Sequence, residues 1–323
     1  MTNFDSAWSD FWSEGNLSSL NTTFDDGYDG SIKQMWNDSF VKLDDNARLL
    51  DLCSGNGSIL KLAIEFCQTN EKSLELNGIE AAKVSESTIQ ELKESHQGIF
   101  NFYSETKVEK FVSEKQYSLV TSQYGIEYTD WSETLPLVAN LLKQDGEAAF
   151  FIHTDSSIVY NIAQDELVQF EKIMSLKFFV ALKKLVREMG DLTRPEDVEK
   201  LKQSKKADKY RNDVNEILAQ LQELAGAYQN ANIIYNCFEL VNAIMKDKKQ
   251  ESAKDKEVFI KKTQQQLEHN AQRLQNMVDS TLTRMQREEF INMAKSAGLE
   301  LTFSQDVLEK GFVVGHQLKF NKS

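Results

Sequence analysis

The residues around Asp51 have the types and spacing of a site for a nucleotide-like ligand. Asp51 lies in the apolar run 48–52, the glycines Gly55 and Gly57 follow it, and helical spacing of apolar residues covers 58–66. Glycine has no Cβ atom, so this backbone can bend sharply and approach a ligand closely. A strand, a glycine turn and a helix N-terminus in this order form the usual ligand site of a parallel α/β sheet.

Two common nucleotide-binding motifs are absent from this turn. A dinucleotide fingerprint has a third glycine three residues after the second, where this chain has Leu60. A P-loop needs a lysine followed by serine or threonine, whereas Ser58 and Ile59 follow Gly57 here. An NAD-type Rossmann enzyme is therefore disfavoured, and an ordinary strand-to-helix turn stays open as an alternative.

The elements that would position this turn alternate between strands and helices. Near-continuous apolar strands separated by helices indicate a parallel sheet covered on both faces, and right-handed crossovers make such a sheet doubly wound. The predicted strands are 48–52, 74–80, 99–103, 117–121 and 147–153, with helices over 58–66, 84–92 and 135–142 between them.

The alternation stops between about 155 and 284, where the pattern is helical throughout. An amphipathic helix is predicted over 158–189. Apolar residues then recur at heptad spacing from Tyr210 to Tyr228 and, after a shift, over 234–245. A polar break over 246–257 precedes a returning apolar stripe from Leu267 to Met285. This pattern predicts a long antiparallel helical hairpin.

Strand signals return at the end of the chain. A helix over 288–297 stops at Gly298, a common residue after a helix C-terminus. Two strands, 299–303 and 311–320, follow with a short connection between them. They must be antiparallel, because a tight turn cannot join parallel neighbours.

These features together resemble the class I S-adenosylmethionine-dependent methyltransferases. The first motif of that family is commonly Asp-x-Gly-x-Gly-x-Gly, and here Asp51, Gly55 and Gly57 match it while Cys53 replaces the first glycine. The resemblance implies an α/β fold with a seven-stranded, doubly wound core. This core would cover 48–154 and 285–323, with an N-terminal helical cap over 1–47. A large all-α insertion, the helical hairpin over 155–284, would separate strand 5 from the last core helix.

S-adenosyl-L-methionine is the cofactor that the resemblance implies. In the family, an acidic residue at the end of the second strand accepts hydrogen bonds from both ribose hydroxyls, and Glu80 stands there. Glu105 matches a carboxylate that accepts from the adenine amino group, and Asp51 would face the ammonium of the methionine end. The cofactor-binding residues so implied are Asp51, Cys53, Ser54, Gly55, Asn56, Gly57, Glu80, Ala81, Ser104, Glu105, Thr106 and Gln123.

Methyl transfer needs little covalent help, because a sulfonium is already activated and the protein must chiefly align the reactants and exclude water. A base helps where the acceptor is a hydroxyl. His153, at the end of the fifth predicted strand, and Tyr124, after the fourth, are the catalytic candidates, with Glu127 and Tyr128 as weaker ones. His96, His269 and His316 have no partners at motif spacing, and no metal site is predicted, since Cys53, Cys67 and Cys237 are scattered.

Charge and composition disfavour nucleic acids as substrates and a membrane-spanning segment in this chain. The chain has 323 residues and a net charge of -13. Residues 155–290 hold 22 basic and 22 acidic side chains, so the remainder, with 15 basic and 28 acidic, carries the whole excess. A nucleic-acid enzyme would show a basic footprint instead. No apolar stretch reaches the ~20 residues of a membrane span, and no secretory signal is evident, so we expect a cytoplasmic protein.

Two functions from different classes follow. The first is a methyltransferase that acts on an unidentified acceptor, a small molecule, covered by the helical insertion. The alternative is a catalytically degenerate methyltransferase scaffold that works as an interaction module, with the heptad pattern forming a homodimer.

Overall fold

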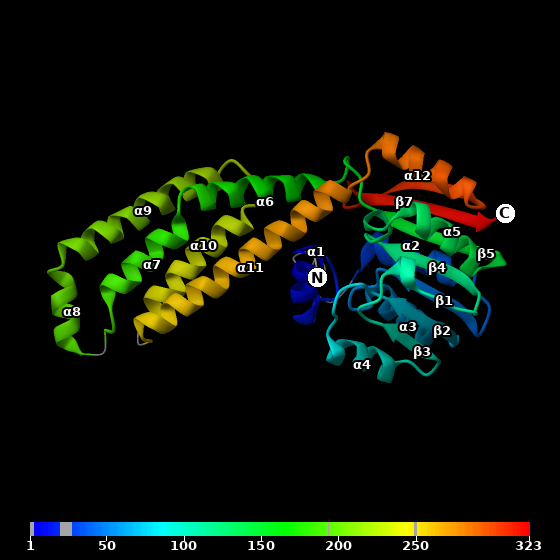
Figure 1. Cartoon of the computed structure of the whole chain (residues 1–323), viewed down its shortest axis with the longest axis horizontal. Helices are drawn as coiled ribbons and strands as arrows, with labels where there is room; N and C mark the ends of the chain where they lie inside the picture. Colours follow the sequence, from blue (N-terminus) through cyan, green and yellow to red (C-terminus); the bar gives the residue numbers. More distant parts are fainter. Residues whose placement is uncertain (1–2, 20–27, 193, 249–250) are drawn as a thin grey trace. The chain divides into compact units, whose positions relative to one another are not determined.

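The computed structural model describes residues 3–19, 28–192, 194–248 and 251–323. The chain separates into two compact units. One consists of Met1–Asn161 with Asn276–Ser323, and the other of Ile162–Gln275. The first unit contains the sheet and the second is helical (Figure 1).

The first unit is built on a seven-stranded sheet with the order β3-β2-β1-β4-β5-β7-β6. Neighbouring strands are parallel from β3 to β5, whereas β7 is antiparallel to both β5 and β6. The predicted sheet, including its antiparallel end, is therefore confirmed. The strands are β1 Ala47–Leu52, β2 Leu74–Ile79, β3 Phe100–Tyr103, β4 Tyr117–Gln123, β5 Leu142–Ile152, β6 Leu299–Glu309 and β7 Phe312–Lys322.

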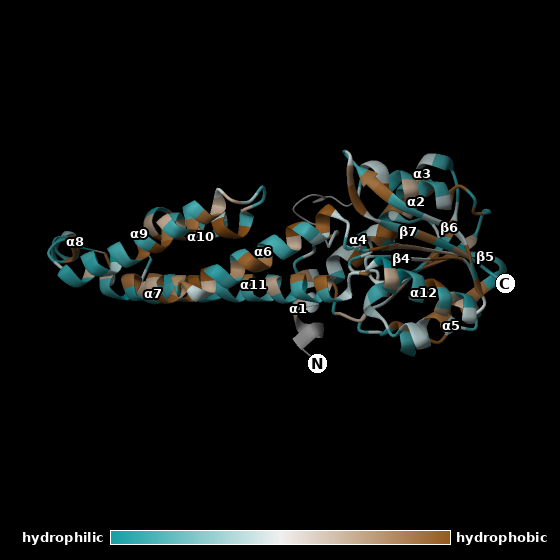
Figure 2. Ribbon diagram, turned by 90° about the horizontal axis from the view of Figure 1, so that it is seen from above, coloured by the Kyte–Doolittle hydropathy of each residue, from teal (hydrophilic) through white to brown (hydrophobic). Residues whose placement is uncertain are grey.

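Helices cover both faces of this sheet. α2 (Gly30–Phe40) and α3 (Ser58–Asn70) pack on one face, and α5 (Trp131–Leu141) and α12 (Arg284–Ser296) pack on the other (Figure 2). Trp36 and Phe40 of α2 and Phe290 of α12 are fully buried. Burial of such large side chains contributes roughly 2–3 kcal/mol each. The segment predicted as an N-terminal helical cap contains α1 (Asn3–Ser13) and α2. Another helix, α4 (Glu86–Ser95), follows β2.

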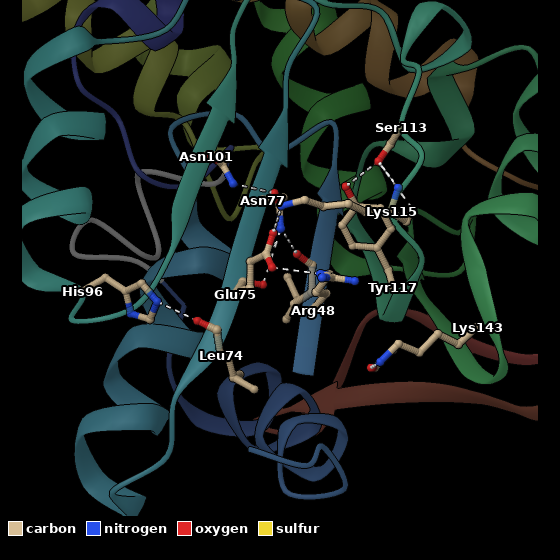
Figure 3. A network of polar contacts seen from close by, with 12 residues as sticks. Arg48, Leu74, Glu75, Asn77, His96, Asn101, Ser113, Lys115, Tyr117 and Lys143 are labelled. Atoms are coloured by element: carbon tan, nitrogen blue, oxygen red, sulfur yellow. Dashed lines mark hydrogen bonds and ion pairs between the residues drawn. The ribbon is translucent and has the colours of Figure 1, made fainter. Parts of the chain in front are cut away.

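A polar network holds the amino ends of the central strands together (Figure 3). Glu75 of β2 accepts hydrogen bonds from Arg48 Nε at 2.9 Å and Lys115 Nζ at 2.6 Å. Asn77, two residues further along β2, donates to the Leu49 carbonyl and accepts from Asn101. These bonds link β1, β2 and β3 at the end of the sheet opposite to the glycine turn.

The second unit has its own apolar core. It contains α7 (Phe178–Met189), α8 (Pro195–Lys202), α9 (Lys205–Ala225), α10 (Asn232–Asn242) and a π-helical turn, η3 (Ala243–Asp247), together with most of α6 (Ile158–Ser175) and α11 (Ala253–Ser280). Phe178 and Leu182 of α7 are buried in one cluster with Leu221 of α9 and Ile234 of α10. Over the part of the chain that is described, no helix is both long enough and apolar enough to cross a membrane.

The observed helices differ from the predicted ones in three places. The helix predicted over 158–189 is two helices, because Lys177 adopts a left-handed φ of 56° between them. The heptad pattern of 210–245 is interrupted after Ala225, and the polar break over 246–257 contains the start of α11. The last stripe also ends early: α11 stops at Ser280, and Met285 belongs to α12 and is 77% exposed.

The heptad residues of α9 face the interior of their own unit. Val214 and Leu221 are buried, and the side chains of Ile217 and Leu224 pack against the same core. α9 lies mainly against α7 rather than forming one arm of a two-helix hairpin. The period of 3.5 residues therefore marks an intramolecular packing face here.

Candidate functional site

The glycine turn joins β1 to α3 in a backbone that few residues could adopt. Gly55 and Gly57 have φ angles of 54° and 83°. A Cβ on Gly55 would lie 2.7 Å from the ring of Trp12, so glycine is required there for space as well as for conformation. Cys53 also has a left-handed φ of 53°, which explains why glycine is the common residue at this position.

Asp51 lies at the end of β1 and is 1% exposed. Its carboxylate accepts hydrogen bonds from Ser54 Oγ at 2.5 Å and Thr121 Oγ1 at 2.8 Å. Burial raises the pKa of Asp51 to about 7, and the charge of Glu80 adds to the effect. The side chain thus fixes the start of the turn and keeps a carboxyl group poised between its two protonation states near neutral pH.

Glu80 directly follows β2 and meets the same turn from the neighbouring strand. Its Oε2 accepts from the backbone N–H of Gly55 at 2.9 Å, and its Oε1 accepts from that of Ala82 at 2.8 Å. Burial raises the pKa of Glu80 in spite of these bonds. The structure therefore brings together the predicted acidic residue and the predicted turn, which are 25 residues apart in sequence.

A cleft of about 350 Å³ opens beside Glu80. Aromatic rings from α1 and from the loop after β4 form much of its wall, with acidic side chains at its polar side. Such a cleft, mostly apolar with a few placed polar groups, is typical of a small-molecule site. The lining residues are Trp8, Trp12, Cys53, Glu80, Ala81, Ala82, Lys107, Val108, Glu109, Tyr124, Gly125, Tyr128 and Thr129.

The loop after β3 is held to the segment that follows β2 by its backbone and by Ser104. Ser104 Oγ and the backbone N–H of Glu105 both reach the Ala82 carbonyl at 3.4 Å, and Thr106 donates its backbone N–H to the Glu80 carbonyl at 2.9 Å. The side chain of Glu105 is exposed, and its φ is 55°. The cleft wall on this side is formed by Lys107 and the two residues after it.

Of the two residues predicted at the end of β4, Tyr124 lines the cleft and Gln123 does not. Gln123 accepts a hydrogen bond from the indole N–H of Trp36 at 2.5 Å, which ties it to α2. Tyr124 has a φ of 52°, lines the cleft with its ring and donates its hydroxyl to the Val314 carbonyl at 2.7 Å. Burial raises the pKa of Tyr124 well above its ordinary value. Tyr124 is thus a wall residue in this structure, and its hydroxyl is not available as a base.

His153 is 2% exposed and stacks on the ring of Tyr124, with the ring centroids 4.1 Å apart. Burial lowers the pKa of His153 to about 3, so the imidazole is neutral at physiological pH. Its backbone N–H donates to Glu127 Oε1 at 2.8 Å. Burial raises the pKa of Glu127 to about 7.

Asn56 connects the N-terminal segment to the turn. Its amide donates to the carbonyls of Trp12 and Asn16, both at 2.8 Å, and its Oδ1 accepts from the backbone N–H of Ser85 at 2.9 Å. The side chain is completely buried. Asn56 therefore positions the aromatic residues of α1 over the turn.

Sequence reasoning missed several parts of this site. Trp8 and Trp12 belong to the predicted N-terminal cap but were not named as site residues. Lys107 and Glu109 were not predicted, because no periodic signal marks a loop that lines a cleft. His316, for which no partner at motif spacing was predicted, bonds Ser304 Oγ at 2.8 Å and Asp306 Oδ1 at 2.5 Å across the β6–β7 pair. The period of two along a hairpin could have predicted that cluster.

No family model matches this sequence, and neither does any curated protein. Solved structures that are similar include 1,6-didemethyltoxoflavin-N1-methyltransferase of Burkholderia thailandensis, at 11% identity and a TM-score of 0.46, covering 99% of this chain and 88% of that one. A TehB-like SAM-dependent methyltransferase of Corynebacterium glutamicum has 10% identity and a TM-score of 0.40, covering 92% and 90%. The YcgJ protein of Bacillus subtilis has 22% identity and a TM-score of 0.31, covering 38% of this chain, which spans half of the length of YcgJ.

These identities and TM-scores are low, so the fold is assigned from the sheet itself. The order β3-β2-β1-β4-β5-β7-β6, with only β7 antiparallel to its neighbours, is the strand order that the sequence resemblance implies. The cleft lies at the carboxyl ends of β1, β2 and β4, which is where an open α/β sheet binds its ligand.

Proposed function

Because the chain has the class I S-adenosylmethionine-dependent methyltransferase fold, we propose that it transfers the methyl group of S-adenosyl-L-methionine to a small-molecule acceptor. One observation carries the proposal: the carboxylate of Glu80 lies within hydrogen-bonding distance of the Gly55 backbone, at the edge of an aromatic cleft. A carboxylate beside a glycine turn is what two ribose hydroxyls and an amino-acid end require.

The residues of the cleft fit this cofactor. S-adenosylmethionine supplies a methyl group on a cationic sulfonium. Three buried carboxyl groups, those of Asp51, Glu80 and Glu127, surround the turn, and the pKa of Cys53 is raised by burial and by the charges of these groups. A cation in the cleft would relieve their mutual repulsion. The rings of Trp8 and Trp12 provide aromatic faces of the kind that attract cations.

Each group has a proposed role. Glu80 would accept from the ribose hydroxyls with the lone pairs that Gly55 and Ala82 leave open. The backbone of the turn would bind the methionine end, while Asp51 supplies negative charge there and holds Ser54. Lys107 and Glu109 join Glu105 as candidates for contacts to adenine.

The proposal makes the helical unit the part that recognises or covers the acceptor. An assembly role is the second candidate, because apolar side chains on this unit are about half exposed, among them Val168, Val180, Tyr235 and Val258. Sedimentation of the full chain distinguishes the two roles. A dimer that dissociates in the Val180→Asp variant, with cofactor affinity unchanged, would support assembly.

Isothermal titration calorimetry with S-adenosylhomocysteine tests the proposed function. We expect a dissociation constant at or below the order of 100 μM, equivalent to about 5.5 kcal/mol. The control variant is Glu133→Gln, which changes an exposed residue in the first turn of α5. It should bind S-adenosylhomocysteine as tightly as the wild-type protein. No detectable heat at this concentration would refute the assignment of the cofactor.

A further inference from the structure

Buried polar atoms without a hydrogen-bond partner among the described residues gather at the ends of β4 and β5. They include Oε2 of Glu127 and Nδ1 of His153, in side chains that are 6% and 2% exposed. Nε2 of Gln123 is another, but the other end of that side chain is bound by Trp36. β4 and β5 are adjacent parallel strands, paired up to Gln123 and Phe151, so the residues that follow them are neighbours. Buried polar atoms in native proteins nearly always have partners, and an exception calls for a functional explanation.

Glu127 is attached by one oxygen and leaves the other open. It lies in the short turn η2 (Ile126–Tyr128), and its Oε1 accepts the backbone N–H of His153. The residues around it in this loop, Tyr124, Gly125, Tyr128 and Thr129, all line the cleft. The carboxylate thus lies directly behind the cleft wall, close enough for its charge to raise the pKa of both Cys53 and Tyr124.

His153 occupies the other side of the same wall. Its ring stacks on Tyr124 with an angle of 7° between the planes, and its neutral Nδ1 can accept or donate a hydrogen bond according to the tautomer. An acid and a neutral imidazole therefore flank one aromatic ring of the cleft.

We propose that Glu127 Oε2 and His153 Nδ1 form the polar anchor of the acceptor, and that this anchor takes an aromatic or heteroaromatic molecule through an N–H or O–H group. This inference rests on the proposed methyltransferase function. It replaces His153 and Tyr124 by Glu127 as the group that accepts the proton.

The chemistry balances without a further reactant. The lone pair of the acceptor nitrogen or oxygen forms the bond to the methyl carbon, and the carbon–sulfur bond breaks with its electron pair passing to sulfur. The proton leaves the acceptor atom for Glu127 Oε2 and then passes to solvent. Since the buried carboxyl group has a pKa of about 7, it can accept and release a proton at neutral pH.

The walls of the cleft favour a flat acceptor without negative charge. Tyr124 and Tyr128, on the side of the cleft next to Glu127, present aromatic rings on which a planar ring can pack. The charged lining residues are Glu80, Glu109 and Lys107, and the acidic excess would repel carboxylates and phosphates.

Two probes of equal shape test the anchor. Benzimidazole carries a ring N–H, and benzothiazole has sulfur in its place. Each is titrated by ligand-observed NMR into the full chain saturated with S-adenosylhomocysteine. We expect the wild-type protein to bind benzimidazole at least about tenfold more tightly, because a site built for an N–H group leaves its acceptor unpaired with the analogue.

The decisive variant is Glu127→Gln. Its carbonyl can still accept from the His153 backbone, so the fold is retained, but an amide N–H₂ replaces the free oxygen. The preference for benzimidazole should fall below about threefold, with the affinity for S-adenosylhomocysteine within about twofold of wild type. Glu133→Gln should behave as wild type.

Three results would overturn the inference. They are equal affinities of the wild-type protein for the two probes, no binding of either probe beside S-adenosylhomocysteine, and an unchanged preference in Glu127→Gln. In each of these cases the bound S-adenosylhomocysteine leaves the proposed cofactor function intact. Failure of the wild-type protein to bind S-adenosylhomocysteine would instead overturn the proposed function, and the anchor with it.

Discussion

Glu75, near the start of β2, and Glu80, directly after its end, have pKa values that are shifted in opposite directions. Glu75 and Glu80 are both 8% exposed. Burial alone would raise the pKa of Glu75, but hydrogen bonds and charge from Lys115 and Arg48 outweigh it and hold that pKa below its ordinary value. Glu80 accepts only backbone N–H groups, and burial keeps its pKa raised.

The difference separates a structural carboxylate from one that is available to a ligand. At the amino end, two cations neutralise Glu75 and fasten β1 and β4 to β2 (Figure 3). At the carboxyl end, Asp51, Glu80 and Glu127 share one region, and no salt bridge is found for them among the described residues. An uncompensated cluster costs stability, which proteins tolerate where a ligand supplies the missing charge.

The largest expected effect is a pH dependence that distinguishes the two ends. The pKa of Asp51 and of Glu127 is about 7 in the folded state, above the ordinary values of 3.8 and 4.5. Between those values the folded state holds protons that the unfolded state releases, so stability falls as pH rises from about 4.5 to 7. The two carboxyl groups alone would lower the stability by roughly 5–6 kcal/mol over this range. The lowered pKa of His153, about 3, acts in the opposite sense and offsets about 2–3 kcal/mol, so the expected net loss is roughly 3 kcal/mol.

Urea unfolding followed by tryptophan fluorescence measures this loss. All four tryptophans, Trp8, Trp12, Trp36 and Trp131, lie in the unit that contains the sheet, so the signal reports on that unit. Asp51→Asn should remove about half of the carboxyl contribution, or roughly 3 kcal/mol, and so leave little net pH dependence. A stability that rises steadily from pH 4.5 to 7 would show that the carboxyl groups are ionised and otherwise compensated.

The next effect concerns ligand affinity. Glu80→Gln should weaken binding of S-adenosylhomocysteine by about 100-fold, or 2.7 kcal/mol, because the amide loses one acceptor oxygen and places an N–H₂ group against a backbone N–H. Calorimetry at pH 7.5 measures the change. Glu75→Gln is the matched control on the same strand and should leave the affinity within about twofold of wild type. Equal weakening by both substitutions would place the ligand away from the carboxyl end of β2.

For the free energy of unfolding, Glu75→Gln should have the clear destabilising effect that it lacks on ligand affinity. At pH 7, Glu75→Gln should lower the free energy of unfolding by about 1–2 kcal/mol, a modest figure because Arg48 and Lys115 are more than one-third exposed. The lowered pKa of Glu75 means that this contribution exists above about pH 4.5 and disappears as pH falls below its folded-state pKa. Denaturation curves at pH 7 and pH 3 test it. A full effect at pH 3 would indicate packing rather than charge.

The contrast also explains how much the sequence could predict. Strands β1, β2 and β4 were predictable because they are buried on both faces, whereas the exposed first half of β5, before the predicted 147, carried no apolar signal. Glu80 could be placed beside the turn because strand ends align at one edge of a parallel sheet. Strand β6 continues to Glu309, well beyond the predicted 303, because exposed strand residues such as Gln305 carry no apolar signal, whereas β7 ends only two residues past the predicted 320.

Features that depend on tertiary contacts were not predictable. The cation partners of Glu75 come from β1 and from the loop before β4, at separations that no spacing rule encodes. The capture of the Tyr124 hydroxyl by Val314 and the burial of His153 likewise arise only when β5 and β7 pair. The helix break at Lys177 was not predictable because the apolar periodicity continues across it, whereas the break after Ala225 left only a shift in the heptad pattern.

The smallest effect lies at Cys53, where the turn departs from the common glycine. A side chain at a φ of 53° is strained by about 1–2 kcal/mol, whereas glycine loses about 0.5–1 kcal/mol more entropy on folding. Comparing Cys53→Gly with Cys53→Ala isolates the Cβ atom, since neither retains the sulfur. We expect the glycine variant to be more stable than the alanine variant by about 0.5 kcal/mol in urea unfolding, with affinity for S-adenosylhomocysteine within about twofold in both. The Cβ atom of Cys53 lies close to Gly125, since a Cβ added to Gly125 would be only 2.4 Å from it. Greater stability of the alanine variant would mean that this packing outweighs the backbone strain at the turn.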